Sequence, residues 1–406
     1  MEFVENGVVA PKGFKANGIH AGIRSNKSKI DLALITSDVK ASAAAVYTSN
    51  LVKGAPIYVT KNNLADGYAQ AMICNSGNAN TCNKNGIEIA SETCKILAKS
   101  LNINENDIIV ASTGVIGLPL SIEPFKAHMD EIVSGLGNTK MHSDLACQGI
   151  MTTDTRKKEV AVKFTLDNKE CYIGAITKGS GMIHPNMATM LCFITTDVSI
   201  SPKMLEKALK ESVNDSFNML SVDGDTSTND TCSIMANGLA GNKTIAKEND
   251  DYYTFLEALK LVNITLAKEM AKDGEGATKL IIAEVKNAKT VNDAKLVAKS
   301  VICSSLLKSA MFGADANWGR VLCAIGYSKA DVDVLKVDMA FASKKGYLKV
   351  CENGYGIPFS EELAKEILLE DEITIKINLN DGKGEASAFG CDLTYDYVKI
   401  NGDYRS

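Results

Sequence analysis

The chain lacks the segments that mark membrane, secreted and nucleic-acid-binding proteins. Among its 406 residues no run approaches the about 18 uninterrupted apolar residues of a membrane span. The N-terminal segment has early acidic residues and no long apolar stretch, so we expect neither a signal peptide nor a transit peptide. The formal net charge is −5, and no basic block with interleaved aromatic residues occurs. We therefore expect a cytoplasmic protein with no membrane or nucleic-acid partner.

Histidine is scarce, which limits the catalytic sites that the chain can build. The four histidines are His20, His128, His142 and His184. None lies in a Gly-x-Ser-x-Gly setting, and the segment Gly179-Ser180-Gly181 is too short for that nucleophile elbow. A Ser-His-Asp hydrolase is therefore not favoured.

Motifs for metal and nucleotide cofactors are also missing. The eleven cysteines include no Cys-x-x-Cys pair, so free and mostly buried thiols are the better interpretation. Asp223 and Asp225 match the first two ligand positions of a calcium loop, but Thr228 and Ile234 replace the required glycine and glutamate. The two glycine-rich phosphate-binding patterns, Gly-x-x-x-x-Gly-Lys-Ser/Thr and Gly-x-Gly-x-x-Gly, do not occur. We expect no metal and no tightly bound cofactor.

What the chain does contain is the pattern of a compact α/β (α+β) protein. Short apolar or alternating runs predict strands, and several segments have helical periodicity. Only seven prolines and no low-complexity linker interrupt the chain, and its length leaves room for two lobes built from mixed sheets and covering helices. The predicted strands include 31–36, 70–74, 107–112, 159–164, 171–176, 279–285 and 372–379, with more in the last twenty residues. The predicted helices are 86–101, 201–214, 251–272, 293–312 and one beginning at 360.

The most informative segment is 177–197, where a glycine-rich turn leads through Ala188 and Thr189 into an apolar strand. A threonine hydroxyl is a weak nucleophile, but a threonine at a chain's N-terminus also carries an amine with a pKa of about 7.7–8.0. That amine can take the hydroxyl proton as general base. The order of residues thus suits a chain that cuts itself between Ala188 and Thr189. From the residues alone an ordinary buried strand is the favoured interpretation of 187–194, since β-branched threonine is common in strands.

Four other polar, glycine-rich segments stand at the ends of predicted strands or helices. In such places backbone N–H groups can bind an anion or an oxyanion. Ordinary turns use the same residues, so each segment leaves both interpretations open. The segments are 75–80, 112–117, 222–230 and 313–320.

The segment from Lys178 to Leu191 resembles the signature of the ornithine acetyltransferase (glutamate N-acetyltransferase) family of arginine biosynthesis. Further segments resemble the family in the same order along the whole chain: 18–22, 47–53, 75–80, 112–117, 151–155, 223–230 and 401–406. Two positions depart from the family pattern, because Ala314-Asp-Ala316 stands where Arg-Asp-Pro is frequent and Ser406 where threonine is common. Neither departure touches the nucleophile.

The resemblance implies a fold, a processing event and an assembly. The expected fold is a layered αββα sandwich with mixed sheets, similar to N-terminal-nucleophile enzymes, with a smaller C-terminal lobe. The expected precursor cleaves itself into an α chain, 1–188, and a β chain, 189–406. Two copies of each chain would form a heterotetramer.

The resemblance also implies an activity and the residues that carry it. Thr189 would take the acetyl group from N2-acetylornithine and pass it to glutamate in a ping-pong cycle, without a cofactor. Thr113 and Gly114 would form the oxyanion hole. Some family members also use acetyl-CoA, and the sequence leaves this second donor open. Substrate contacts carry over to Thr152, Lys178, Thr189, Glu275, Asn401 and Ser406, with Lys178 suited to a carboxylate and Glu275 to an ammonium group.

Two other classes of function stay open at this point. A related self-processing aminopeptidase or amidase would pass the acyl group to water instead of glutamate. A non-catalytic binding protein would require that Thr189 never becomes an N-terminus. The ending 401–406 and the segment 151–155 favour the transferase.

Self-cleavage predicts two fragments in the denatured mass spectrum of the purified protein. They should have masses of about 20 and 23 kDa, in proportion to 188 and 218 of the 406 residues. Thr189→Ala removes the attacking hydroxyl, so this variant should give one full-length species. A single full-length species in both samples would remove the amine base and contradict the nucleophile prediction.

Overall fold

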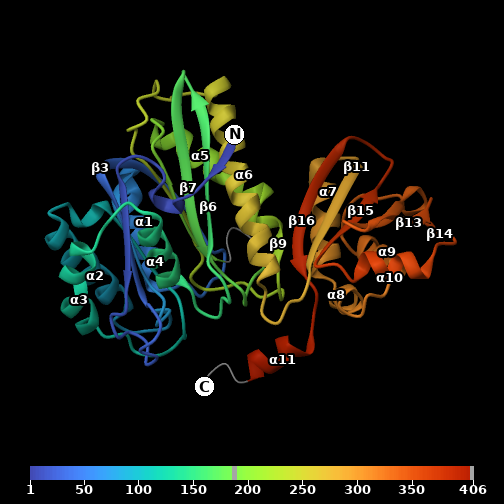
Figure 1. Ribbon diagram of the computed structural model, residues 1–406, viewed down its shortest axis with the longest axis horizontal. Helices are drawn as coiled ribbons and strands as arrows, with labels where there is room; N and C mark the ends of the chain where they lie inside the picture. Colours follow the sequence, from blue (N-terminus) through green and yellow to red (C-terminus); the bar gives the residue numbers. More distant parts are fainter. Residues whose placement is uncertain (185–189, 403–406) are drawn as a thin grey trace. The chain divides into compact units, whose positions relative to one another are not determined.

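The computed structural model describes residues 1–184 and 190–402, which form two compact units. The larger unit contains residues 1–179, 190–214 and 226–266. The smaller unit contains 180–184, 215–225 and 267–402. Figure 1 shows that each unit has its own sheet with its own helices.

In the described residues the larger unit has one sheet of nine strands. The order is β1-β6-β7-β8-β10-β3-β4-β5, with β2 also paired to β3. The pairs β8–β10 and β4–β5 are parallel and the others antiparallel, so the sheet is mixed. Its strands are β1 (Glu2–Val4), β2 (Phe14–Ile19), β3 (Leu32–Tyr47), β4 (Tyr68–Asn75), β5 (Ile108–Ser112), β6 (Lys158–Leu166), β7 (Lys169–Lys178), β8 (Leu191–Thr196) and β10 (Thr231–Ala236).

Helices cover both faces of the part of this sheet formed by β3, β4 and β5. Successive strand side chains point to opposite faces, and both sets are apolar here. Leu34, Ile73 and Val110 join one core with α1 (Ala55–Asn63), α2 (Gly86–Leu101) and α3 (Glu123–Ser134). Their chain neighbours, among them Ile35 and Met72, join a second core with α4 (Lys140–Ile150). Burial on both faces explains why these strands are nearly continuous apolar runs.

Two further helices complete the larger unit. Helix α5 (Pro202–Asp215) begins at the predicted proline. Helix α6 (Asp250–Lys272) passes into the smaller unit after Leu266. The two are joined in the core, where Asn263 Nδ2 donates to Ser212 Oγ over 2.8 Å.

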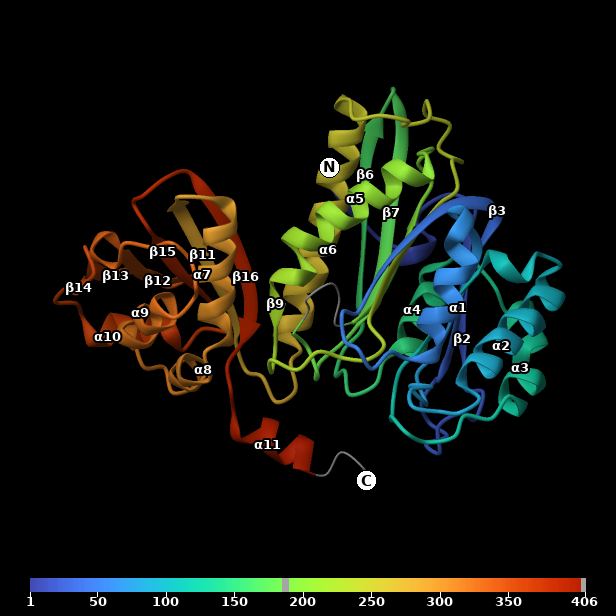
Figure 2. The same ribbon diagram turned by 180° about the vertical axis from the view of Figure 1, so that it is seen from behind.

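In the described residues the smaller unit has a sheet of seven strands in the order β14-β13-β12-β15-β11-β16-β9. Apolar side chains of this sheet form one core with four helices, which gather around it in Figure 2. The strands are β9 (Leu220–Ser221), β11 (Leu280–Ala288), β12 (Asp338–Ser343), β13 (Gly346–Glu352), β14 (Tyr355–Gly356), β15 (Glu372–Asn378) and β16 (Gly384–Cys391). The helices are α7 (Val291–Cys303), α8 (Ser305–Phe312), α9 (Trp318–Gly326) and α10 (Glu361–Leu368), followed later by α11 (Tyr395–Gly402).

The structure confirms the predicted class, with two mixed sheets, covering helices and a smaller C-terminal lobe. The prediction of one helix over 293–312 is wrong, because the extended backbone of Ser304 separates α7 from α8 and its hydroxyl caps α8 by accepting from Leu307 N. The last twenty residues contain α11 as well as part of β16. No helix in the described ranges is long and apolar enough to span a bilayer.

Two neighbouring strands that follow the predicted cut, β8 and β10, lie between strands that precede it in the larger sheet. β8 follows the cut and pairs with β7, which precedes it, over six residue pairs. β10 also follows the cut and pairs with β3, which precedes it, again over six residue pairs. Separating the predicted α and β chains would therefore break two ladders in the middle of a sheet.

The two fragments should consequently stay together until the protein unfolds. We expect them to co-elute in size-exclusion chromatography without denaturant and to separate only in a denaturant that also abolishes the circular dichroism of the sheet. The uncut Thr189→Ala protein gives the reference transition. Release of either fragment from a folded remainder would contradict this sheet order.

Candidate functional site

The predicted oxyanion residues and the predicted substrate lysine meet where β5 and β7 end. Thr113 and Gly114 directly follow β5, and Lys178 ends β7. Lys178 Nζ lies 3.2 Å from Thr113 Oγ1 and donates to it. Because this contact uses the hydroxyl oxygen as acceptor, the Thr113 proton remains to be donated to another oxygen. The arrangement provides a hydroxyl donor next to a lysine.

Gly114 occupies a backbone position that only glycine fits. Its φ is +127°, and a Cβ there would lie 2.9 Å from both Asn78 N and Gly77 C. The Thr113 N–H already donates to Asn75 O over 2.9 Å. The oxyanion role predicted for these two residues therefore falls to the Thr113 hydroxyl and the Gly114 N–H.

Asparagine side chains hold the two loops that surround Gly114. Asn75 Oδ1 accepts from Gly77 N and Asn78 N, and Asn75 Nδ2 donates to Ser112 Oγ over 2.7 Å. Asn229 Nδ2 donates to Ser112 O over 2.8 Å and to Ala79 O over 2.5 Å. The polar segment 75–80 thus has a structural role, since it fixes the turn after β5.

A buried ion pair that the sequence analysis did not single out supports Thr152 and Lys178. Asp154 Oδ1 lies 2.6 Å from Lys158 Nζ, and both side chains are fully buried. The same oxygen accepts from Gly179 N over 2.8 Å, while Oδ2 accepts from Thr152 N over 2.9 Å. One carboxylate thereby connects the loop of Thr152 to the end of β7. The sequence feature that could have indicated this ion pair is an aspartate in the family segment 151–155 with a lysine four residues later.

The charges around Lys178 favour an anionic ligand. Burial alone would raise the pKa of Asp154, but Lys158, Lys178 and the hydrogen bonds lower it to about 2, so it is ionised and matched by Lys158. Burial lowers the pKa of Lys178 below its usual value, against the opposing effects of Asp154 and Asp230. Asp230 is 2% exposed, and burial raises its pKa well above the usual range. Since Asp154 is matched by Lys158, the Lys178 Nζ that contacts the Thr113 hydroxyl is suited to a carboxylate or a developing oxyanion.

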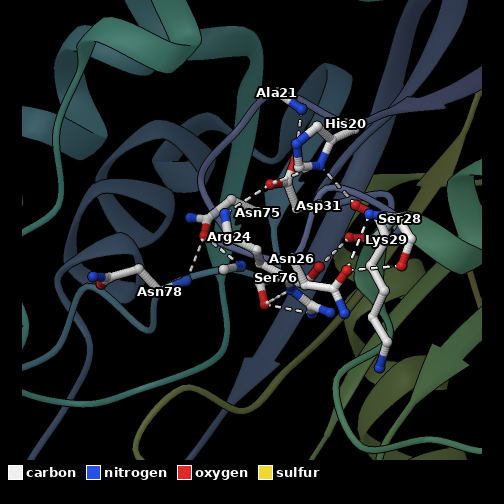
Figure 3. Close-up of polar contacts among 12 residues, drawn as sticks. His20, Ala21, Arg24, Asn26, Ser28, Lys29, Asp31, Asn75, Ser76 and Asn78 are labelled. Atoms are coloured by element: carbon white, nitrogen blue, oxygen red, sulfur yellow. Dashed lines mark hydrogen bonds and ion pairs between the residues drawn. The ribbon is translucent and has the colours of Figure 1, made fainter. Parts of the chain in front are cut away.

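Arg24, which Figure 3 shows in contact with Asp31 and Ser76, holds the loop that leads to Thr152. Its guanidinium donates to Met151 O and, from Nε, to Ser76 O over 2.8 Å. Its backbone N–H donates to the fully buried Asp31, which also accepts from Ala21 N over 2.6 Å. Asp31 thus connects Ala21, in the family segment 18–22, with Arg24, which contacts the loop that leads to Thr152.

The smaller unit brings together the other two described site residues. Glu275 follows α6, is 8% exposed and accepts from Asn401 Nδ2 over 2.8 Å at Oε2. The Glu275 N–H donates to Ser180 O over 2.9 Å. Gly276 permits the close approach of α11, because a Cβ at its φ of +69° would lie 2.6 Å from Tyr397 N. Glu275 is thus a buried carboxylate beside an amide, a combination suited to an ammonium group.

The predicted site residues therefore fall into three groups. Thr113, Gly114, Thr152 and Lys178 belong to one polar cluster of the larger unit, and Glu275 and Asn401 to one of the smaller unit. Ala188, Thr189 and Ser406 lie outside the described residues. Within the described ranges no group of three or more His, Cys, Asp or Glu side chains could hold a metal ion.

Comparison with known proteins identifies the family. The profile described as the ArgJ family matches residues 15–406. The chain belongs to the ArgJ family. This confirms the resemblance seen around Lys178 and the assignment to enzymes of arginine biosynthesis.

Relatives in this family match over nearly the full chain. The arginine biosynthesis bifunctional protein ArgJ of Caldanaerobacter subterraneus subsp. tengcongensis is 51% identical over 407 residues, which cover 100% of both chains. ArgJ 1 of Clostridium acetobutylicum is 51% identical over 394 residues, 97% of this chain and 96% of the relative.

Two solved structures match as well. ArgJ from Bacillus halodurans is 46% identical and covers 52% of this chain and 98% of its own, with a TM-score of 0.49. Ornithine acetyltransferase from Mycobacterium tuberculosis, complexed with ornithine, is 34% identical and covers 46% of this chain and 99% of its own, with a TM-score of 0.43.

Removing the Thr113 hydroxyl should slow the reaction without changing the fold. Thr113→Val keeps the shape of the side chain but loses the donor, so kcat should fall about 10²–10³-fold, as for other oxyanion-hole donors. Thr113→Ser keeps the hydroxyl and should retain most activity. The measurement is acetyl transfer to glutamate by each variant. A Thr113→Val enzyme as fast as Thr113→Ser would contradict the oxyanion role.

Proposed function

We propose that this ArgJ family member transfers the acetyl group of N2-acetylornithine to glutamate through an acetyl ester on Thr189. The observation that carries the proposal is the contact of Lys178 with the Thr113 hydroxyl beside a position that only glycine fits. The Thr113 hydroxyl and the Gly114 N–H are hydrogen-bond donors of the kind that stabilises the negative oxygen of a tetrahedral acyl-transfer intermediate. The relatives' names as arginine biosynthesis and ornithine acetyltransferase proteins support the same reaction.

The nucleophile would be made by self-cleavage. The Thr189 hydroxyl attacks the Ala188 carbonyl carbon, the bond from that carbon to the Thr189 nitrogen breaks, and the nitrogen gains a proton. Water then hydrolyses the resulting ester, which leaves the Ala188 carboxylate and a free Thr189 hydroxyl and amine. The products are the α chain, 1–188, and the β chain, 189–406.

The transfer itself would take two acyl steps. The Thr189 amine accepts the hydroxyl proton while Oγ attacks the acetyl carbonyl, and ornithine leaves with that proton on its amine. The amine of glutamate then attacks the acetyl ester, and N-acetylglutamate leaves as the proton returns to Oγ. The Thr113 hydroxyl and the Gly114 N–H hold the oxyanion in both steps.

Substrate binding would use two charged side chains. Lys178 suits a substrate carboxylate, because Asp154 is already matched by Lys158. Glu275, with Asn401 beside it, suits a substrate ammonium group. Thr152 and Ser406 remain predicted substrate contacts, as does Thr189.

The assembly and the second donor are further parts of the proposal. Two α and two β chains would form the heterotetramer, and acetyl transfer between the two amino acids needs no cofactor. Relatives named as bifunctional support acetyl-CoA as a second donor of acetyl groups. The cytoplasmic location stays a prediction from the sequence.

The dependence of ornithine release on glutamate tests the proposal. Without glutamate the enzyme should release about one ornithine per β chain in a burst and then stop, because the acetyl ester has no acceptor. With glutamate, release should continue and the double-reciprocal plots should be parallel. Thr189→Ala should show neither phase. Continued release at the same rate without glutamate would instead identify an amidase that uses water.

A further inference from the structure

The segment 180–184 lies a few residues before the predicted cut and is held at several points by the smaller unit. Ser180 O accepts from Glu275 N over 2.9 Å, and Ile183 O accepts from Val222 N over 2.7 Å. His184 Nδ1 lies 3.0 Å from Ser221 Oγ. Most of these partners come from 221–225, a stretch of the predicted β chain, although the segment itself belongs to the predicted α chain.

Asp223 makes the strongest of these contacts. Its Oδ2 accepts from Met182 N over 2.6 Å and its Oδ1 from Ile183 N over 2.9 Å. Oδ1 also accepts from Asp225 N over 3.2 Å, which holds the carboxylate within its own loop. One carboxylate therefore fixes two successive amides, and hydrogen bonds to a charged acceptor are stronger than those between neutral groups.

The segment needs such a partner, because Met182 has an unfavourable backbone conformation. Its φ is +54°, in the left-handed region that side chains other than glycine, asparagine and aspartate rarely adopt. The Met182 side chain is 44% exposed and the next residue, Ile183, is fully buried. The hydrogen bonds to Asp223 hold the chain in this conformation, which turns it between Ser180 and the buried Ile183.

The stretch that carries Asp223 is itself anchored. Val222 O accepts a hydrogen bond from the Lys308 ammonium, and Lys308 is 5% exposed. Lys299 Nζ donates to Leu220 O over 2.6 Å. Both lysines belong to helices that pack in the core of the smaller unit. Their hydrogen bonds therefore hold the backbone on the N-terminal side of Asp223 in place.

We propose that Asp223 is a positioning residue for self-cleavage, which it promotes by fixing the main chain at Met182 and Ile183. The inference rests on the proposed function, because it requires a cut at Ala188–Thr189. Attack of a hydroxyl on the preceding carbonyl needs both groups held in a narrow geometry, and misplacement by about 1 Å can cost about 10²-fold in rate. Asp223 itself touches neither reacting group.

The test is a time course of cleavage during cell-free synthesis, followed by intact mass. Asp223→Asn should slow cleavage by at least about 10-fold, because the amide presents an N–H group where one backbone N–H needs an acceptor. Asp225→Asn is the matched control: it removes the same charge from an exposed side chain two residues away and should cleave at the wild-type rate. Thermal unfolding of the uncut proteins shows whether each variant is folded.

A second variant separates positioning from a general loss of stability. Glycine adopts a positive φ without strain, so Met182→Gly combined with Asp223→Asn should recover part of the cleavage rate. Equal cleavage rates for Asp223→Asn and Asp225→Asn would overturn the inference. It would also be overturned if the Asp223→Asn protein is unfolded and the added Met182→Gly change does not restore cleavage. A wild-type chain that stays uncut would overturn the proposed function and this inference together.

Discussion

The buried carboxylate of Asp154 is the constraint on which the candidate site in the larger unit depends. It binds a lysine ammonium and two backbone amides at once, and those amides belong to Thr152 and to the residue after Lys178. Breaking such a buried pair on one side leaves an uncompensated charge, which typically costs about 3–5 kcal/mol. The positions of Thr152 and Lys178 are therefore linked through the side chain of Asp154.

A carboxylate that accepts from two backbone amides also occurs in the smaller unit, where Asp223 binds the N–H groups of Met182 and Ile183. Both aspartates act on the short stretch around the glycine-rich turn, one on Gly179 and the other on Met182 and Ile183. A glycine-rich turn has little conformational preference of its own. Carboxylates from distant parts of the chain fix the backbone conformation of this turn by accepting hydrogen bonds from its amides.

The sequence predicted the class of fold because the apolar runs and helical periods are long and regular in this chain. Helix 86–101 and the strands of the larger sheet follow directly from such patterns. The break at Ser304 was missed because helical periodicity continues across it, and α11 was missed because its eight residues carry little pattern. Neither the sheet order nor the separation into units follows from local pattern, since both depend on contacts between distant residues.

The candidate site was predicted for a different reason. Composition and spacing left Thr189 open between a nucleophile and a buried strand residue, and the family resemblance supplied the roles. Even the resemblance did not point to Asp154 as a support or to Asn229 as the residue that holds the turn after β5. Supporting residues of this kind act through backbone groups, and a sequence does not show which amides a side chain will reach.

The pairing of strands from both sides of the predicted cut in one sheet would affect how this protein folds and refolds. Before the cut the strands belong to one chain, so folding is a unimolecular process whose rate does not depend on concentration. After the cut the same sheet can be regained from the unfolded state only when two separate chains meet, at the additional cost of lost translational freedom. The mature protein would then hold a structure that its fragments reach less readily than its precursor does, and the long-term persistence of activity would depend on slow unfolding more than on refolding.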